Sequence, residues 1–347
     1  MSTGKTVGIL GGGQLGRMLA HPAALLSIPL LILDSGASTP AKQVILPPPG
    51  HASHVDGPFT SREHILELAS KVDVLTVEIE HVDANVLDEV EQAGKVEVHP
   101  SPRTIKVIQD KYEQKRYLVE REVAVADFLP VERSTSDPAV VEQSIQAAAR
   151  ELGLPLMLKA RTLAYDGRGN FVLKETSASA IAKALEFLGD RPLYAERWAP
   201  FDREIAVMVV RTPTGEVASY DPVETVHEDS ILRLVLCPLR AGGKGVISRA
   251  KQLAEKAVSC LHGAGIFGVE MFLMPDSAYG RPHAVILSLT CSTLAKTRSS
   301  STRLRPGRTT LATTRSRPAT RRNLRTTFGR LRRSRSARPR SRSPRRQ

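Results

Sequence analysis

The chain has 347 residues, which is enough for two or three domains, and 41% of them are hydrophobic, as in ordinary globular proteins. Its formal net charge of +13 would suit a nucleic-acid-binding protein, but the charge is unevenly distributed. Residues 289–347 contain 19 Lys and Arg and no Asp or Glu, which leaves 30 basic against 36 acidic residues in 1–288. The charge argument for nucleic-acid binding therefore applies only to residues 289–347.

The cysteines and the hydropathy pattern indicate in which cellular compartment the protein lies. Cys237, Cys260 and Cys291 are odd in number and lack the spacing of a metal site. No signal-peptide pattern precedes the first apolar run, and no apolar segment reaches the roughly 20 residues that cross a membrane. We therefore expect a cytoplasmic protein with no membrane association.

Residues 1–105 have the pattern of a doubly wound α/β domain. Short apolar runs that can form buried parallel strands alternate with helical stretches. The expected strands are Thr6–Leu10, Pro29–Leu33, Val72–Ile79 and Val96–Pro100. Ligands of such a domain bind at the carboxyl ends of the strands.

Residues 106–288 show a different pattern. A helical stretch at Ser101–Val119 leads into strands that are interrupted by few helices, which indicates an α+β domain with an antiparallel sheet. The strands are expected at 156–159, 170–173, 193–196, 204–210, 217–225, 231–237, 267–274 and 284–289, with helices near 178–188 and 251–262. From residue 289 the chain is rich in Ser, Thr, Arg and Pro without apolar periodicity, so we expect 289–347 to be a disordered tail.

A glycine motif opens the first domain. Gly11-Gly12-Gly13-Gln14-Leu15-Gly16 matches G-x-G-x-x-G between a strand and a helix, and Asp34 follows at the end of the next strand. The motif is compatible with a phosphate group at the helix N-terminus. It is equally compatible with tight packing of strand against helix, and these two interpretations stay open.

Several charged residues end apolar strands. Glu78 and Glu80 lie at the end of one strand and share a face because strand side chains alternate. They form either a solvated strand end or an acidic pair at the mouth of the cleft. Lys159 ends the run Leu156–Lys159, where an unpaired ammonium is costly to bury unless it meets phosphate oxygens or extends to solvent. The following Tyr165-Asp166-Gly167-Arg168-Gly169-Asn170 can fold over a polyphosphate or form a hairpin turn.

Four further residues are candidates for a functional site. Trp198 in Glu196-Arg197-Trp198-Ala199 can border an adenine site or anchor the core, while Glu204 nearby can accept ribose hydroxyls. Glu270 lies within the apolar run Phe267–Met274, where a carboxylate is a candidate Mg²⁺ ligand. His227 is either a structural histidine or a catalytic base.

Taken in chain order, these segments resemble the ATP-grasp superfamily, and within it N5-carboxyaminoimidazole ribonucleotide synthetase, the ATP-dependent part of fungal phosphoribosylaminoimidazole carboxylase. The resemblance covers about residues 1–288. The segments that carry it are GILGGGQLGRML (8–19), VLTVEIEHV (74–82), QDKYEQK (109–115), KARTLAYDGRGNFV (159–172), ERWAPFDREIAVMV (196–209), PVETVHEDSILRL (222–234) and GVEMF (268–272).

The resemblance implies a Rossmann-like pre-ATP-grasp domain at 1–105 and an ATP-grasp domain at 106–288. It implies activation of bicarbonate by ATP as carboxyphosphate, then transfer of the carboxyl group to the amine of aminoimidazole ribonucleotide. The implied ATP-binding residues are Lys111, Lys159, Tyr165, Asp166, Gly167, Arg168, Gly169, Asn170, Glu196, Arg197, Trp198, Ala199 and Glu204. Substrate contacts are implied for Gly13, Gln14, Leu15 and Glu80, catalysis for Arg168 and His227, and a Mg²⁺ ligand for Glu270.

The C-terminal sequence departs from the family pattern. The family continues with an Asn-Glu-x-x-Pro-Arg segment that supplies a second Mg²⁺ carboxylate, whereas this chain continues Ser288-Leu289-Thr290-Cys291. We therefore expect an incomplete ATP-grasp domain, a missing or frame-shifted C-terminal part and impaired activity. The alternatives are another ATP-grasp ligase, or a protein that binds nucleic acid non-specifically through its basic tail. The family also suggests a homodimer.

Overall fold

The computed structural model describes residues 4–47, 50, 53–133, 138–163, 169–228, 231–274 and 283–291. The predicted loop residues Tyr165, Asp166, Gly167 and Arg168, and residues 292–347 of the predicted tail, lie outside these ranges. Among the described helices, none is both long and apolar enough to span a membrane.

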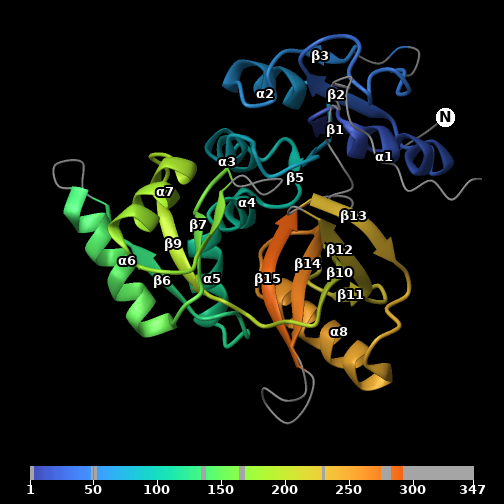
Figure 1. Cartoon of the computed structure of the whole chain (residues 1–347). Coiled ribbons are helices and arrows are strands. Elements are labelled where there is room, and N and C mark those ends of the chain that lie inside the picture. The colour runs from blue at the N-terminus through green and yellow to red at the C-terminus, as the bar shows by residue number, and fades with distance from the viewer. Residues whose placement is uncertain are drawn as a thin grey trace, which may run out of the picture. The chain divides into compact units, whose positions relative to one another are not determined.

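The N-terminal region contains a parallel sheet with the strand order β3–β2–β1–β4–β5 (Figure 1). Its central strands are buried apolar runs, as predicted, because helices cover both faces of such a sheet. The strands are β1 (Val7–Leu10), β2 (Leu30–Asp34), β3 (Val55–Asp56), β4 (Val74–Val77) and β5 (Glu97–Val98). The connecting helices are α1 (Gln14–Leu25), α2 (Arg62–Ala69) and α3 (Ala84–Gln92).

The single helix predicted over Ser101–Val119 is in fact two helices, α4 (Pro102–Gln109) and α5 (Lys111–Val119). Asp110 has an extended backbone and forms the N-cap of α5, where its carboxylate accepts hydrogen bonds from the amides of Tyr112 and Glu113. This capping satisfies amides that a continuous helix would have bonded to the preceding turn. The break at Asp110 directs the start of α5 toward the site described below.

A four-stranded antiparallel sheet of order β6–β9–β7–β8 follows, with α6 and α7 packed along it (Figure 1). Leu156, Leu158 and Ala160 are buried against these helices, which leaves Lys159 on the opposite face of the sheet. The elements are β6 (Phe128–Val131), α6 (Pro138–Leu152), β7 (Leu156–Ala160), β8 (Asn170–Leu173), α7 (Ala178–Leu188) and β9 (Leu193–Arg197).

A second antiparallel sheet has the order β13–β12–β10–β14–β15, with β11 paired to β10 and α8 packed against β10, β11 and β15. Its elements are β10 (Arg203–Arg211), β11 (Val217–Ser219), β12 (Val223–Glu228), β13 (Ile231–Leu236), α8 (Gly243–Ser259), β14 (Gly265–Met274) and β15 (His283–Cys291). The predicted fold class, α/β followed by α+β, is confirmed.

Strand β15 extends beyond residue 288, where the sequence predicted the second domain to end. It continues to Cys291, and Leu289 and Thr290 are buried at 0% and 3% exposure. Leu289 exchanges hydrogen bonds with the side chain of Gln114 on α5, its N–H donating to Oε1 and its carbonyl accepting from Nε2, both at 2.9 Å. The first residues after Ser288 therefore belong to the core, because β14 and α5 supply hydrogen-bond partners that sequence composition does not reveal.

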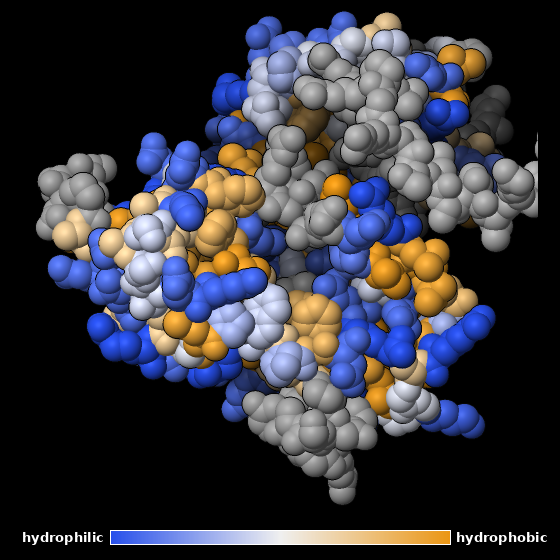
Figure 2. Space-filling view, viewed as in Figure 1, coloured by the Kyte–Doolittle hydropathy of each residue, from blue (hydrophilic) through white to orange (hydrophobic). Residues whose placement is uncertain are grey.

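The edge strand β13 has little cover in the described part of the chain. Leu234, Val235 and Leu236 are 51%, 36% and 39% exposed and belong to an apolar surface patch that Figure 2 shows over β13. An uncovered apolar edge strand favours association.

His54 is predicted to make the stability of the N-terminal sheet depend on pH. Its Nδ1 accepts from the amide of Ile32 on β2 at 3.2 Å, and its Nε2 donates to the carbonyl of Ile45 at 2.7 Å, so the folded protein holds a neutral imidazole. Burial lowers the pKa of His54, opposed by the hydrogen bond to Ile45 and aided by Lys42. Below about pH 6.5 the unfolded chain therefore takes up a proton that the folded chain does not, and stability falls.

We expect the free energy of unfolding to decrease below about pH 6.5 by at most about 1.4 kcal/mol per pH unit through His54. Urea denaturation at pH 5 to 8 measures this slope, and His54→Gln is expected to reduce it. His21→Gln, at an exposed position on α1, serves as the control. Equal pH dependence of the parent and the His54 variant would contradict the prediction.

Candidate functional site

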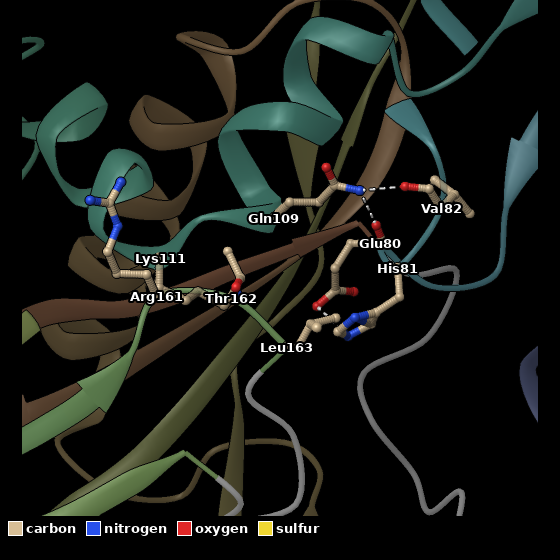
Figure 3. A pocket seen from close by; sticks show the side chains of 8 residues that line it. All are labelled: Glu80, His81, Val82, Gln109, Lys111, Arg161, Thr162 and Leu163. Atoms are coloured by element: carbon tan, nitrogen blue, oxygen red, sulfur yellow. Dashed lines mark hydrogen bonds and ion pairs between the residues drawn. The ribbon is translucent and has the colours of Figure 1, made fainter. Parts of the chain in front are cut away.

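A pocket of about 340 Å³ lies where the end of β4, the junction of α4 with α5 and the segment after β7 meet (Figure 3). These are carboxyl ends of strands and a helix start, which expose polar backbone and charged side chains. The residues that line the pocket are Glu80, His81, Val82, Gln109, Lys111, Arg161, Thr162 and Leu163. Two of the predicted site residues, Glu80 and Lys111, are thus brought to one pocket although 31 positions separate them.

Gln109 holds the segment that carries Glu80. Its side-chain Nε2 donates to the carbonyls of Glu80 and Val82, both at 2.7 Å, which fixes the chain directly after β4 (Figure 3). The Glu80 carboxylate lies 4.0 Å from Nε2 of His81, and Glu80 is only 6% exposed. This acidic group at the pocket wall is suited to accept hydrogen bonds from a ligand amine or hydroxyl.

Glu78 and Glu80 do not act as the pair that strand alternation predicts. Strand β4 ends at Val77, so both residues follow the strand, and their side chains have separate partners. The Glu78 carboxylate accepts from the amides of Gly13 at 2.6 Å and Leu15 at 3.0 Å. Only Glu80 lines the pocket.

The glycine loop is closed by protein carboxylates. In addition to the contacts of Glu78, the Gly12 amide donates to Asp34 at 2.7 Å. A Cβ atom on Gly13 would lie 2.6 Å from Oε1 of Glu78, so glycine is required there for the close approach of this carboxylate. The packing interpretation of the motif accounts for these contacts, since the amides that would bind a cofactor phosphate are already bonded. The substrate contacts predicted for Gly13 and Leu15 would have to use other atoms, whereas the Gln14 side chain is exposed.

Lys111 and Arg161 line the pocket and also contact residues outside it. Lys111 Nζ donates to Ser288 Oγ at 2.9 Å and to the Leu289 carbonyl at 3.1 Å, on β15. Arg161 points away from Glu80 in Figure 3, and its guanidinium forms a two-point contact with Asp110 at 2.6 to 3.1 Å. The Asp110 hydrogen bond is the main cause of a raised Arg161 pKa. Arg161 therefore joins the end of β7 to the cap of α5.

Two predicted nucleotide residues, Lys159 and Glu196, are in direct contact. Lys159 Nζ lies 3.1 Å from Oε1 of Glu196, on the face of the β6–β9–β7–β8 sheet opposite its helices. The other carboxylate oxygen, Oε2, lies 3.0 Å from Nζ of Lys115 on α5. Burial alone would raise the pKa of Glu196, but Lys115 and Lys159 together hold it below its usual value. The ion pair with Glu196, and not extension into solvent, therefore explains how the Lys159 ammonium is accommodated.

The rest of the predicted adenine strand is solvent-accessible. Trp198 is 39% exposed, so the alternative that it anchors the core is wrong. Arg197 turns toward α6, donating to Asp127 at 2.8 Å and to the Leu152 carbonyl at 2.6 Å. Ala199 follows the end of β9 at a half-buried position. At the other predicted segment, Gly169 directly precedes β8, and Asn170 begins it opposite Lys159 of β7, at the border of the loop outside the described residues.

Glu204 and His227 also lie together, on the neighbouring strands β10 and β12. Nδ1 of His227 contacts Oε2 of Glu204, and both side chains are about a quarter exposed. An imidazole bound to a carboxylate in this way is held in one orientation. Their assignment to ribose binding and catalysis stays a prediction.

Glu270 lies on β14, directly opposite Ser288 on β15. Among the described residues, no group of three His, Cys, Asp or Glu side chains could hold a metal ion. Mg²⁺ prefers six oxygen ligands in octahedral geometry, of which proteins supply one or two carboxylates plus substrate phosphates. Ser288, directly opposite Glu270, is not a carboxylate, so these two residues do not form the two-carboxylate Mg²⁺ site that the resemblance implies, and we derive no catalytic step through the metal.

Sequence reasoning missed Lys115, Gln109 and Arg161 as site residues. For Lys115 a signal was present, because it lies three residues after Tyr112 and three before Leu118, on the helix face that is otherwise directed inward. Lysine is rarely buried without a partner, so its position on this face indicates a carboxylate in the fold. Which carboxylate it meets was not readable from the sequence.

Two family models match consecutive parts of this chain. A family model of the ribonucleotide synthetase preATP-grasp domain matches residues 4–109, and one of the ATP-grasp domain matches residues 116–280. The phosphoribosylaminoimidazole carboxylase of Candida albicans is 52% identical over 274 residues, covering 79% of this chain and 46% of the relative. The chain spans about half the length of the curated fungal relatives it matches.

Two solved structures from Aspergillus clavatus are similar over 83% of this chain and 70% of theirs. The carboxyaminoimidazole ribonucleotide synthase complexed with ATP is 43% identical with a TM-score of 0.74. The N5-carboxyaminoimidazole synthase in complex with ADP and 5-aminoimidazole ribonucleotide is 42% identical with a TM-score of 0.73. By sequence, by domain order and by fold, this chain belongs to the N5-carboxyaminoimidazole ribonucleotide synthase family of ATP-grasp enzymes.

Proposed function

We propose that this chain binds ATP and aminoimidazole ribonucleotide in the manner of its family and has a low rate of carboxylation by itself. The observation that carries the proposal is the convergence of Glu80 and Lys111 on one pocket. The contact between Lys159 and Glu196 places a cation at the end of β7. The complexes of the Aspergillus clavatus relatives with ATP, ADP and aminoimidazole ribonucleotide support the choice of ligands.

The proposed reaction has two steps. A bicarbonate oxygen attacks the γ-phosphorus of ATP, ADP leaves, and carboxyphosphate forms. The exocyclic amine nitrogen of aminoimidazole ribonucleotide then attacks the carboxyl carbon, the bond to phosphate breaks, and the amine loses a proton. Positioning and charge stabilisation dominate the catalysis of such phosphoryl transfer.

The residues of this chain have distinct proposed roles. Lys159 would bind a phosphate group of the nucleotide, and the exposed strand end around Trp198 would border the adenine. Glu80 would accept a hydrogen bond from the ribonucleotide, since it is an acidic group on the wall of the pocket. Glu270 is the proposed Mg²⁺ ligand. A cytoplasmic location and a homodimer stay predictions.

Isothermal titration of the full chain with ADP tests the nucleotide site. We expect saturable binding, and Lys159→Met is expected to weaken it by about 10- to 100-fold, which corresponds to about 1.4–2.8 kcal/mol of binding free energy. Lys174→Met is the control, because Lys174 is an exposed lysine directly after β8. Absence of ADP binding by the parent chain, or equal affinity of parent and Lys159→Met, would refute the proposed site.

A further inference from the structure

Lys115 is a buried lysine that the proposed reaction does not use. Its side chain is 2% exposed, that of Glu196 is 3% exposed, and that of Lys159 is 12% exposed. The two ammonium groups contact different oxygens of one carboxylate, at 3.0 and 3.1 Å. Lys115 lies on the closed side of Glu196, on α5, and Lys159 lies on its more open side, on β7.

The surroundings of this triad provide little other negative charge. The ring of Phe128 lies 5.7 Å from Nζ of Lys115, and Tyr194 beside Glu196 is buried with its pKa raised well above the usual value, mainly by burial. Asp127, the other acid that influences Lys115, is largely exposed and bonded to Arg197. Among the described neighbours, two cations thus share one buried carboxylate, which gives the triad a formal charge of +1.

A buried charge that is not compensated is costly, so it attracts an anion or loses a proton. Burial outweighs the opposing effect of Glu196 and holds the pKa of Lys115 below its usual value. If Glu196 had only Lys159 as a partner, the pair would be neutral and Lys159 would gain less from an incoming phosphate. Lys115 changes this balance, because it occupies one oxygen of the carboxylate from the side that a ligand does not reach.

We propose that Lys115 is a positioning residue for nucleotide binding: by holding one oxygen of Glu196 it leaves the charge of Lys159 available to a polyphosphate. This inference rests on the proposed function, because it assumes that Lys159 contacts the nucleotide. Lys115 itself does not touch the ligand. Its effect is electrostatic, which distinguishes it from a role in packing alone.

Variants that change the charge of the triad distinguish an electrostatic role of Lys115 from a role in packing. Lys115→Met makes the triad neutral, so ADP and inorganic tripolyphosphate are both expected to bind about tenfold or more weakly. Lys115→Arg keeps the charge and is expected to retain most of the affinity. The double variant Lys115→Met with Glu196→Gln again has a formal charge of +1 and keeps the backbone of β9. Its affinity for tripolyphosphate, which has no adenine or ribose for the predicted contacts of Glu196, is expected to return to within about threefold of the parent.

Titration calorimetry at one fixed salt concentration measures all variants, and thermal unfolding without ligand shows whether each is folded. Arg116→Met is the matched control, because it removes a positive charge from the exposed face of the same helix. If Lys115→Met does not fold, Lys115→Gln replaces it, since glutamine keeps a hydrogen-bond donor without the charge.

Each outcome decides the role of Lys115. Weak binding by Lys115→Met together with recovery in the double variant supports it. Equal binding by parent and Lys115→Met overturns it while leaving the nucleotide site intact. Weak binding of tripolyphosphate by both Lys115→Met and the double variant also overturns it, because it would indicate a structural role. Failure of the parent chain to bind ADP overturns both this inference and the proposed function.

Discussion

Replacing residues 288–347 with the corresponding segment of the Candida albicans carboxylase is expected to raise the rate of ATP-dependent carboxylation by at least about 10²-fold. The physical reason lies at the pairing of β14 with β15, where Glu270 faces Ser288, which is not a carboxylate. The Asn-Glu-x-x-Pro-Arg segment that the resemblance implies for the family would supply a second carboxylate. The measurement is formation of ADP that depends on aminoimidazole ribonucleotide and bicarbonate.

Two controls make the chimaera informative. The same replacement combined with Glu270→Gln is expected to lose the gain, because one carboxylate would again be missing. ADP affinity of the chimaera and of the parent is expected to be similar, since Lys159 and Glu196 are present in both. A parent chain that turns over as fast as the chimaera would show that residues 288–347 already complete the site.

Glu78→Ala is expected to lower the free energy of unfolding by about 2–4 kcal/mol, because the amides of Gly13 and Leu15 lose their acceptors in a buried environment. The carboxylate also lies at the N-terminus of α1, where a negative charge is favourable. Glu78 is 6% exposed, so water replaces it poorly. Urea denaturation monitored by far-ultraviolet circular dichroism measures the loss.

The control for this variant is Glu67→Ala, which removes an exposed glutamate that pairs with Lys71 on the surface. Its expected effect is below about 1 kcal/mol, as for other exposed ion pairs. Glu78→Gln is expected to be intermediate, because its amide oxygen can still accept from one of the two backbone groups. A loss for Glu78→Ala no greater than that for Glu67→Ala would refute the role assigned to Glu78.

Local sequence patterns gave the central elements of the fold but not its edges. The runs around Ile9 and Ile32 were predicted as buried parallel strands, and both lie at 0% exposure. Strand β3 has only two residues, too few for a periodic signal. Strand β6 contains Pro130, which disfavours a central strand and is tolerated because β6 lies at the edge of its sheet.

The sequence by itself determined the family, the order of the two domains and the residues that end apolar strands, including Lys159 and Glu196. The family follows from motifs that resemble it, and the strand ends follow from periodicity along the chain. Both are local properties of the sequence. The tertiary structure decided which charges meet. Lys115 and Glu196 are 81 positions apart, and Glu78 lies 65 positions from Gly13. Their contacts follow from the packing of helix against sheet, which brings together residues that no local pattern links.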